Sequence, residues 1–238
     1  MEHHPITWAS LIPGISSMPA HTVHATLVMV LLIVFAQRAN RQLAAARAAG
    51  THLVPDEGLT VRNIAELLAG GVGSMIEGVL GKGGERYLGL FGSFFAFIFT
   101  ANLLGLIPGF APPTSDFNIT FGLGVASFLA YNAIGIHAQG LVNYLKHFMG
   151  PIWWLAVLMV PLELIDNMVR PISLALRLFG NMTGDHLVLE IFTDLTKLVI
   201  PVIFYFLGAF VSLIQAFVFT LLSIIYVSMA VGHGDDHH

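Results

Sequence analysis

One stretch of the sequence, residues 152–192, combines an apolar composition with charged and amide side chains that could bind ions or move protons. At ~100° per residue these polar side chains fall mostly on one helix face, between about −80° and +40° from Glu163. The set is Glu163, Asp166, Asn167, Arg170, Ser173, Arg177, Asn181 and Asp185. The spacing therefore predicts a long apolar helix with a single polar stripe.

Arg177 is the member of the stripe that is hardest to explain, because no acidic residue lies within one helical turn of it. A charge at the centre of a membrane helix costs about 2.5–3.5 kcal/mol on insertion scales, so such residues usually face a partner or a water-filled cavity. An arginine, with a pKa above ~12, can hold an anion or a carboxylate but is a poor proton relay. Glu163 and Arg170, two turns apart, are candidates to neutralise each other.

Two interpretations of the stripe stay open at this point. One is an ion or substrate path. The other is a buried helix–helix interface held by hydrogen bonds, with Arg170 and Asp166 reaching the headgroups near a helix end.

A second polar group lies away from the arginines. His186 and Glu190 are spaced i,i+4, at roughly 140° and 180° from Glu163, and are therefore neighbours. A histidine with a pKa near 6.5 beside a carboxylate can exchange protons at neutral pH, although a local surface ion pair explains the spacing equally well. In the last apolar segment, Ser212 and Gln215 are compatible with a simple interhelical hydrogen bond.

The composition shows which kind of protein positions these residues. Of 238 residues, 56% are hydrophobic and 10% are charged, against roughly 25% charged in a soluble domain. Several apolar runs approach the ~20 residues that a membrane-crossing helix needs, and they lack the period-2 alternation of barrel strands. The absence of cysteine excludes disulfides and thiolate chemistry. We expect an all-α integral membrane protein.

Charge placement predicts the topology of a single membrane domain, residues 1–238. Basic residues follow the first apolar run and lie between later runs, so by the positive-inside rule the N-terminus faces out and the C-terminus faces the cytoplasm. About five membrane helices and one interfacial helix are expected, the last two forming a long, steeply tilted hairpin. The predicted segments are 20–37 (membrane), 59–80 (interfacial), 87–107 and 118–138 (membrane), and 152–192 and 196–231 (tilted hairpin).

The run Arg170-Pro-Ile-Ser-Leu-Ala-Leu-Arg177-Leu-Phe-Gly-Asn-Met182 closely resembles the signature of subunit a of the F-type ATP synthase. The similarity extends along nearly the whole chain and keeps the family's order. The other matching blocks are Ala101-Asn-Leu-Leu-Gly-Leu-Ile-Pro108, Asp116-Phe-Asn-Ile-Thr120, Pro161-Leu-Glu-Leu-Ile165, Leu213-Ile-Gln-Ala-Phe217 and Tyr226-Val-Ser-Met-Ala230.

The resemblance implies a stator channel subunit that conducts protons through two half-channels to and from the carboxylates of a c-subunit ring, coupling proton flow to rotation and ATP synthesis. Arg177 matches the family's essential arginine, and Asn181 and Gln215 look like its polar neighbours. Glu163, Asp116 and Asn118 match channel positions. We place Arg170, Ser173 and Ser212 beside them as lining or supporting residues.

The same resemblance implies the partners and the location. The c ring, the b-subunit peripheral stalk and, through them, the catalytic F1 head are the expected partners, in a bacterial inner membrane. The chain is expected to be non-catalytic alone and to use no cofactor, no metal, no directly bound nucleotide and no nucleic acid.

One position departs from many bacterial members of that family, because His186 stands where they have a glutamate. Organellar members also have histidine there and pair it with an acid from the last helix, where this chain has Gly208. Glu190, one turn from His186, is our candidate for the missing carboxylate.

Two other classes of function are weighed against this one. A secondary transporter could use the arginine to hold an anionic substrate, but it predicts internal repeats with broken helices, which the sequence does not show. A purely structural scaffold leaves the cost of Arg177 unexplained.

Overall fold

The structure is a computed structural model that describes residues 19–50, 58, 60–147, 156–196 and 199–232. Within these ranges the regular elements are all helical, as predicted for the fold class. In chain order they are α1 (Ala20–Ala48), α2 (Val61–Leu80), η2 (Gly84–Tyr87), α3 (Leu88–Leu104), η3 (Pro113–Ser115), α4 (Phe117–Gln139), α5 (Leu141–His147), α6 (Ala156–Leu195) and α7 (Val199–Gly232).

In the part of the chain that the structure describes, four helices are long and apolar enough to cross a membrane: α1, the continuous η2–α3 unit, α4 and most of α7. The chain is therefore an all-α, multi-pass membrane protein. The fifth predicted membrane segment, α6, is not among them by composition, since it carries the polar stripe. Its membrane placement stays a prediction, and residues 152–155 of the predicted segment lie outside the described residues.

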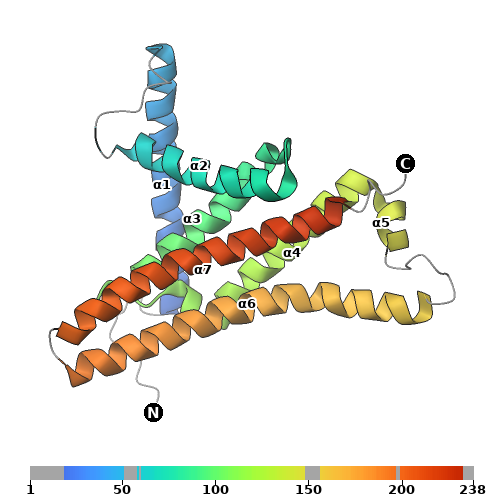
Figure 1. Cartoon of the computed structure of the whole chain (residues 1–238). Helices are drawn as coiled ribbons and strands as arrows, with labels where there is room; N and C mark the ends of the chain where they lie inside the picture. Colours follow the sequence, from blue (N-terminus) through green and yellow to red (C-terminus); the bar gives the residue numbers. More distant parts are fainter. Residues whose placement is uncertain (1–18, 51–57, 59, 148–155, 197–198, 233–238) are drawn as a thin grey trace.

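α2 lies across the C-terminal half of α1, nearly at a right angle to it (Figure 1). Thr60 caps its N-terminus by accepting a hydrogen bond from the Asn63 amide at 3.2 Å, and it ends at Gly81, whose φ of 69° favours glycine. Val72 and Ile76 on one side are buried in the molecule. If α1 crosses the membrane, α2 follows its surface, as an interfacial helix must.

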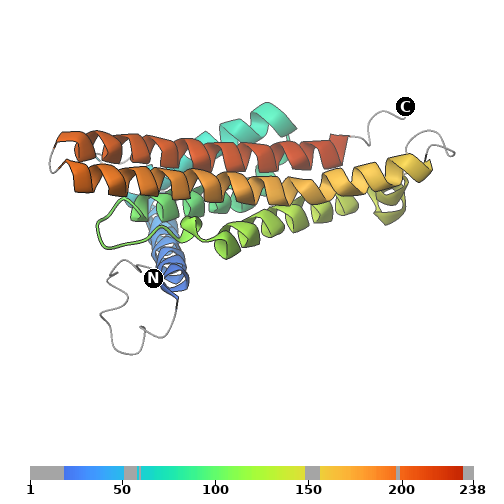
Figure 2. The ribbon, with the colours of Figure 1, turned by 90° about the horizontal axis from the view of Figure 1, so that it is seen from below.

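α6 and α7 lie close together where the C-terminal end of α6 meets the N-terminal end of α7, and they diverge toward their other ends (Figure 1); Figure 2 shows the pair from a second direction, crossing α1. At 1.5 Å per residue, the 40 residues of α6 span roughly 60 Å, about twice the hydrocarbon thickness of a bilayer. A helix of this length must tilt strongly to stay in the membrane. The lengths are those of the predicted hairpin, and its tilt in a membrane stays a prediction.

The hydrophobic core lies where α2, α3 and α4 meet one side of this hairpin. Aromatic side chains of α3 fill much of it, with Phe94 packing edge-on against Phe219 of α7. The other buried members include Val72, Ile76, Phe91, Phe95, Ile98, Tyr131, Leu174, Leu178, Met182, Ala216, Ile224 and Val227. The core therefore covers one side of α6 and leaves its other side open.

Candidate functional site

Helical periodicity places Arg177 on the uncovered side of α6. Leu174, Leu178 and Met182, spaced by four, are each no more than 2% exposed and hold that face in the core. Arg177 and Asn181 lie on the neighbouring face and are exposed. Among the ion pairs formed within the described residues, none includes Arg177.

Large apolar side chains are exposed on both helices of the hairpin that carries Arg177. Leu176 beside it is 52% exposed, and α7 also directs large apolar side chains outward. Those of α7 include Phe206, Leu207, Phe210, Leu213, Ile214 and Phe217, exposed by 43–80%. A guanidinium in such a surface has a strong need for a counter-charge, since water and lipid headgroups are distant from the middle of a bilayer.

Asn181, one turn after Arg177, connects the two helices of the hairpin. Its Nδ2 donates to the Gln215 Oε1 at 2.8 Å, and Gln215 is only 3% exposed. The sequence placed both residues beside the arginine, and the structure brings them into contact. Ser212, by contrast, is buried and its hydroxyl donates to the Gly208 carbonyl of its own helix at 2.7 Å.

The N-terminal half of α6 is held by polar contacts inside the chain. Arg170 donates to the Asp166 carboxylate, with Nη2 at 2.6 Å, and its guanidinium lies 5.3 Å from the centre of the Tyr226 ring. The expected neutralisation of Arg170 by Glu163 is wrong, because one turn brings Asp166 within reach whereas two turns separate the other pair. Glu163 and Ser173 are both half-buried.

His186 and Glu190 form no ion pair within 4 Å, although both are described by the structure; His186 is half-buried and Glu190 is exposed. The carboxylate beside Gly208 is instead that of Asp185. A methyl group on Gly208 would come within 3.0 Å of the Asp185 Oδ2 and 2.7 Å of Leu106. From the sequence, Asp185 belonged to the polar stripe but not to the candidate site residues. The glycine at position 208 was the signal that could have found it.

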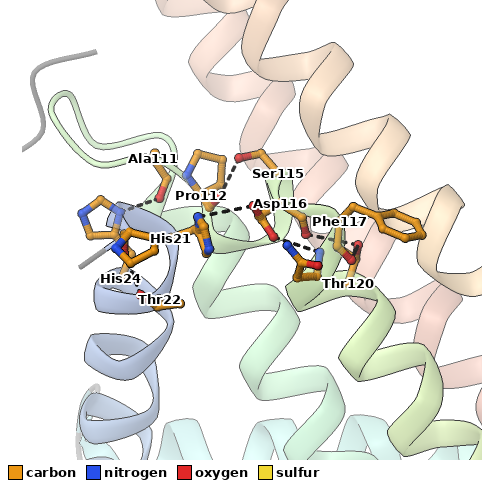
Figure 3. Close-up of polar contacts among 11 residues, drawn as sticks. His21, Thr22, His24, Ala111, Pro112, Ser115, Asp116, Phe117 and Thr120 are labelled. Atoms are coloured by element: carbon orange, nitrogen blue, oxygen red, sulfur yellow. Dashed lines mark hydrogen bonds and ion pairs between the residues drawn. The ribbon is translucent and has the colours of Figure 1, made fainter. Parts of the chain in front are cut away.

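Asp116 is the residue before α4, at the end of the loop that follows α3 (Figure 3), and Asn118 lies in the first turn of α4. The Asp116 Oδ1 caps α4 by accepting from the Asn118 amide at 2.8 Å, and its Oδ2 lies 3.3 Å from the His21 Nδ1 of α1. Nearby, the buried His24 donates from Nδ1 to the Ala111 carbonyl at 2.9 Å. These contacts tie α1 to the loop between α3 and α4, and Asn118 itself is exposed.

The chain matches the sequence model of one protein family over nearly its whole length. That model, the ATP synthase A chain, covers residues 21–228. The chain belongs to the ATP synthase A chain family.

Named relatives of this family agree along most of the chain. "ATP synthase subunit a" of Bdellovibrio bacteriovorus is 43% identical over 97% of this chain and 98% of the relative. The protein of the same name from Geobacter sulfurreducens is 47% identical over 70% of this chain and 72% of its own, and "ATP synthase subunit a 1" of Syntrophotalea carbinolica is 41% identical over 88% and 85%. The family resemblance read from the sequence is therefore confirmed.

Proposed function

We propose that this member of the ATP synthase A chain family is the stator channel subunit of the membrane sector, and that it carries protons to and from the carboxylates of a rotating c ring. The observation that carries the proposal is the placement of Arg177. It is a permanent cation that is exposed on the open side of the hairpin, has no ion-pair partner among the described residues and lies in an apolar surface. Such a residue needs an acidic partner from another chain.

A carboxylate that passes Arg177 is stabilised in its charged form, because an opposite charge nearby lowers the pKa of an acid. It therefore releases its proton on approach and takes one up only after it has moved away. The same fixed charge repels protons and blocks a direct leak past the arginine. One side chain in this way separates two proton paths and couples each to rotation of the ring.

The two paths are assigned to opposite ends of the hairpin. We place the inner path along the N-terminal half of α6, at Glu163 and Ser173, with Arg170 as a supporting residue. The outer path lies beyond Asn181 and Gln215, where His186 exchanges protons with a carboxylate. Both Glu190 and Asp185 lie within one turn of His186 in sequence, so the acid is one of these two.

The orientation follows from the basic loops, with the N-terminus outside and the C-terminal end of α7 in the cytoplasm. In Figure 1, α2, α5 and the C-terminal ends of α1 and α7 lie toward the top and right, and the C-terminal end of α6 lies toward the lower left. This arrangement supports loops that alternate between the two sides of the membrane. A b-subunit stalk and a catalytic head complete the assembly, and the chain itself binds no nucleotide and catalyses nothing alone.

Proton pumping in inverted membrane vesicles tests the central assignment. Arg177→Ala should abolish ATP-driven acidification while the chain still co-purifies with a c ring, a b stalk and the catalytic head. Acidification at the normal rate in this variant would overturn the role of Arg177. Failure of the unaltered chain to co-purify with those partners would overturn the assembly.

A further inference from the structure

Pro171, one of two prolines inside α6, interrupts the backbone hydrogen bonding of that helix. Pro171 has no peptide N–H, so the carbonyl four residues earlier, that of Asn167, has no donor at position 171. Pro171 is buried, so bulk water does not replace the lost bond. Helices inside membranes tolerate such a residue only when a neighbouring group satisfies the freed carbonyl.

Tyr131 of α4 supplies that group. Its hydroxyl is within hydrogen-bond distance of two oxygens of Asn167, the backbone carbonyl at 3.2 Å and the nearer side-chain oxygen. The tyrosine is 2% exposed, and its ring is fixed by Phe128 on its own helix and by Tyr226 on α7. The hydroxyl is therefore held at the one carbonyl that Pro171 deprives of its helical donor.

A second contact from α4 fixes the other side of the same proline. A Cβ on Gly124 would lie 2.5 Å from the Pro171 carbonyl oxygen, so only glycine allows the two backbones to approach this closely. Gly124 and Tyr131 are seven residues apart, which places them on one face of α4. The proline-interrupted turn of α6 thus lies between a backbone contact and a side-chain hydrogen bond, both from α4.

We propose that Tyr131 is a positioning residue for proton transport: its hydroxyl completes the backbone of α6 at Pro171 and so fixes the segment that presents Arg177. Pro171 precedes Arg177 by six residues, or roughly 9 Å along the helix. The inference rests on the proposed function, in which the position of Arg177 decides whether a passing carboxylate is deprotonated or leaks its proton.

The hydrogen bond from the Tyr131 hydroxyl to the Asn167 carbonyl is called the cap below, and its loss would disturb α6 at Pro171. A buried carbonyl without a donor is unfavourable, so α6 would bend or rotate at Pro171 until another donor is found. Arg177 would then occupy several positions relative to the ring. Some carboxylates would pass it without discharging, and protons moved per ATP hydrolysed would fall.

A double-mutant cycle on the assembled complex tests this reasoning. Tyr131→Phe removes only the hydroxyl, and Pro171→Ala restores the peptide N–H that makes the cap unnecessary. In inverted vesicles, Tyr131→Phe should lower the protons pumped per ATP hydrolysed by about 2- to 10-fold, the range that one hydrogen bond gives. In the Pro171→Ala background the same substitution should have a clearly smaller effect. Equal fold losses in both backgrounds, or no loss from Tyr131→Phe alone, would overturn the proposal.

Asn167→Ala provides a background that keeps the proline and the backbone carbonyl but removes the side-chain oxygen. Tyr131→Phe should still lower coupling there, because the carbonyl remains to be capped. If the effect disappears in Asn167→Ala, the side-chain bond was the important one and the cap is disproved. This arm remains measurable even if Pro171→Ala does not assemble.

Two controls separate this inference from the proposed function. Tyr87→Phe removes a hydroxyl from the start of α3, where the ring packs on Phe91, and should pump like the unaltered chain. Arg177→Ala should abolish pumping. If it does so while Tyr131→Phe pumps normally, only the positioning role fails; if Arg177→Ala pumps normally, the proposed function itself fails.

Discussion

Arg170 and Arg177 lie two turns apart on α6, yet their surroundings are opposite. The Arg170 side chain is 16% exposed, bonded to Asp166 and placed over the Tyr226 ring. Arg177 is exposed and forms none of the ion pairs found among the described residues. The first arginine is satisfied by its own chain, and the second has no acidic partner among the residues that the structure describes.

The same division extends to the rest of the helix. Before Pro171, Tyr131 and Asn132 of α4 contact Asn167, and the Tyr144 hydroxyl donates to the Asn132 Oδ1 at 2.7 Å. After Arg177, the polar side chains have few contacts, of which Asn181 with Gln215 is the clearest. The difference indicates that the N-terminal half of α6 is held by contacts within the chain, which fits the proposal that the C-terminal half faces a c ring.

The conservative substitutions Arg177→Lys and Arg170→Lys should differ most in their effect on proton pumping. A lysine in apolar surroundings loses its proton readily, whereas arginine does not, so Arg177→Lys should reduce ATP-driven pumping at least about tenfold. Arg170→Lys keeps a cation beside Asp166 and should pump within about twofold of the unaltered chain, since exposed pairs contribute little. The readout is acidification of inverted vesicles, corrected for the amount of chain in the membrane. Comparable losses at both positions would remove the distinction between them.

The second prediction concerns the acid that is proposed to exchange protons with His186, in the part of α6 that follows Arg177. Asp185 is half-buried beside Gly208, whereas Glu190 is exposed. We expect Asp185→Asn to slow proton transport several-fold and Glu190→Gln to slow it less, because a partly buried carboxylate is the better-placed proton acceptor. His186→Ala is the common reference and should be slower than the unaltered chain. A larger loss from Glu190→Gln would restore the pairing that the sequence suggested.

Much of this architecture could be predicted from the sequence because the bilayer restricts the choices. Long apolar runs must be helices, and Pro108 with Gly109 marks the end of one of them. The family, and the match of Arg177 to its essential arginine, followed from the contiguous motif at residues 170–182. Asn181 and Gln215 were identified as neighbours from that resemblance, and they are bonded in the structure.

Contacts between helices could not be predicted in the same way, because they depend on how α4 and α6 are rotated about their axes. Periodicity placed Glu163, Asp166 and Arg170 on related faces but did not choose which acid the arginine would bind. The role of Tyr131 was also invisible, since a tyrosine in an apolar helix has many ordinary explanations. The position of the Asp185 carboxylate beside Gly208 could not be predicted either, because it depends on how α6 and α7 pack.

The third prediction tests the hydrogen bond between Asn181, in the C-terminal half of α6, and Gln215 of α7. Gln215→Leu removes the acceptor of the Asn181 amide, and Asn181 is exposed enough to find other partners. We expect pumping to fall about 2- to 10-fold, less than for Arg177→Lys, since one neutral hydrogen bond is lost. Ser212→Ala is a matched control one turn away, because that hydroxyl bonds only within its own helix at Gly208. A loss from Ser212→Ala as large as that from Gln215→Leu would show that packing of α7, rather than the bond to Asn181, sets the rate.

The smallest effect is expected for Asp166→Asn, in the N-terminal half of α6. Its carboxylate is 61% exposed, so the pair with Arg170 contributes at most about 1 kcal/mol. The guanidinium keeps its contact with the Tyr226 ring after the substitution, which is worth about 0.5–2 kcal/mol. Arg170→Ala, which removes both contacts, should therefore lower the melting temperature of the purified complex more than Asp166→Asn. If Asp166→Asn instead stopped proton pumping, Asp166 would lie on the inner proton path beside Glu163 and would not serve only to hold Arg170.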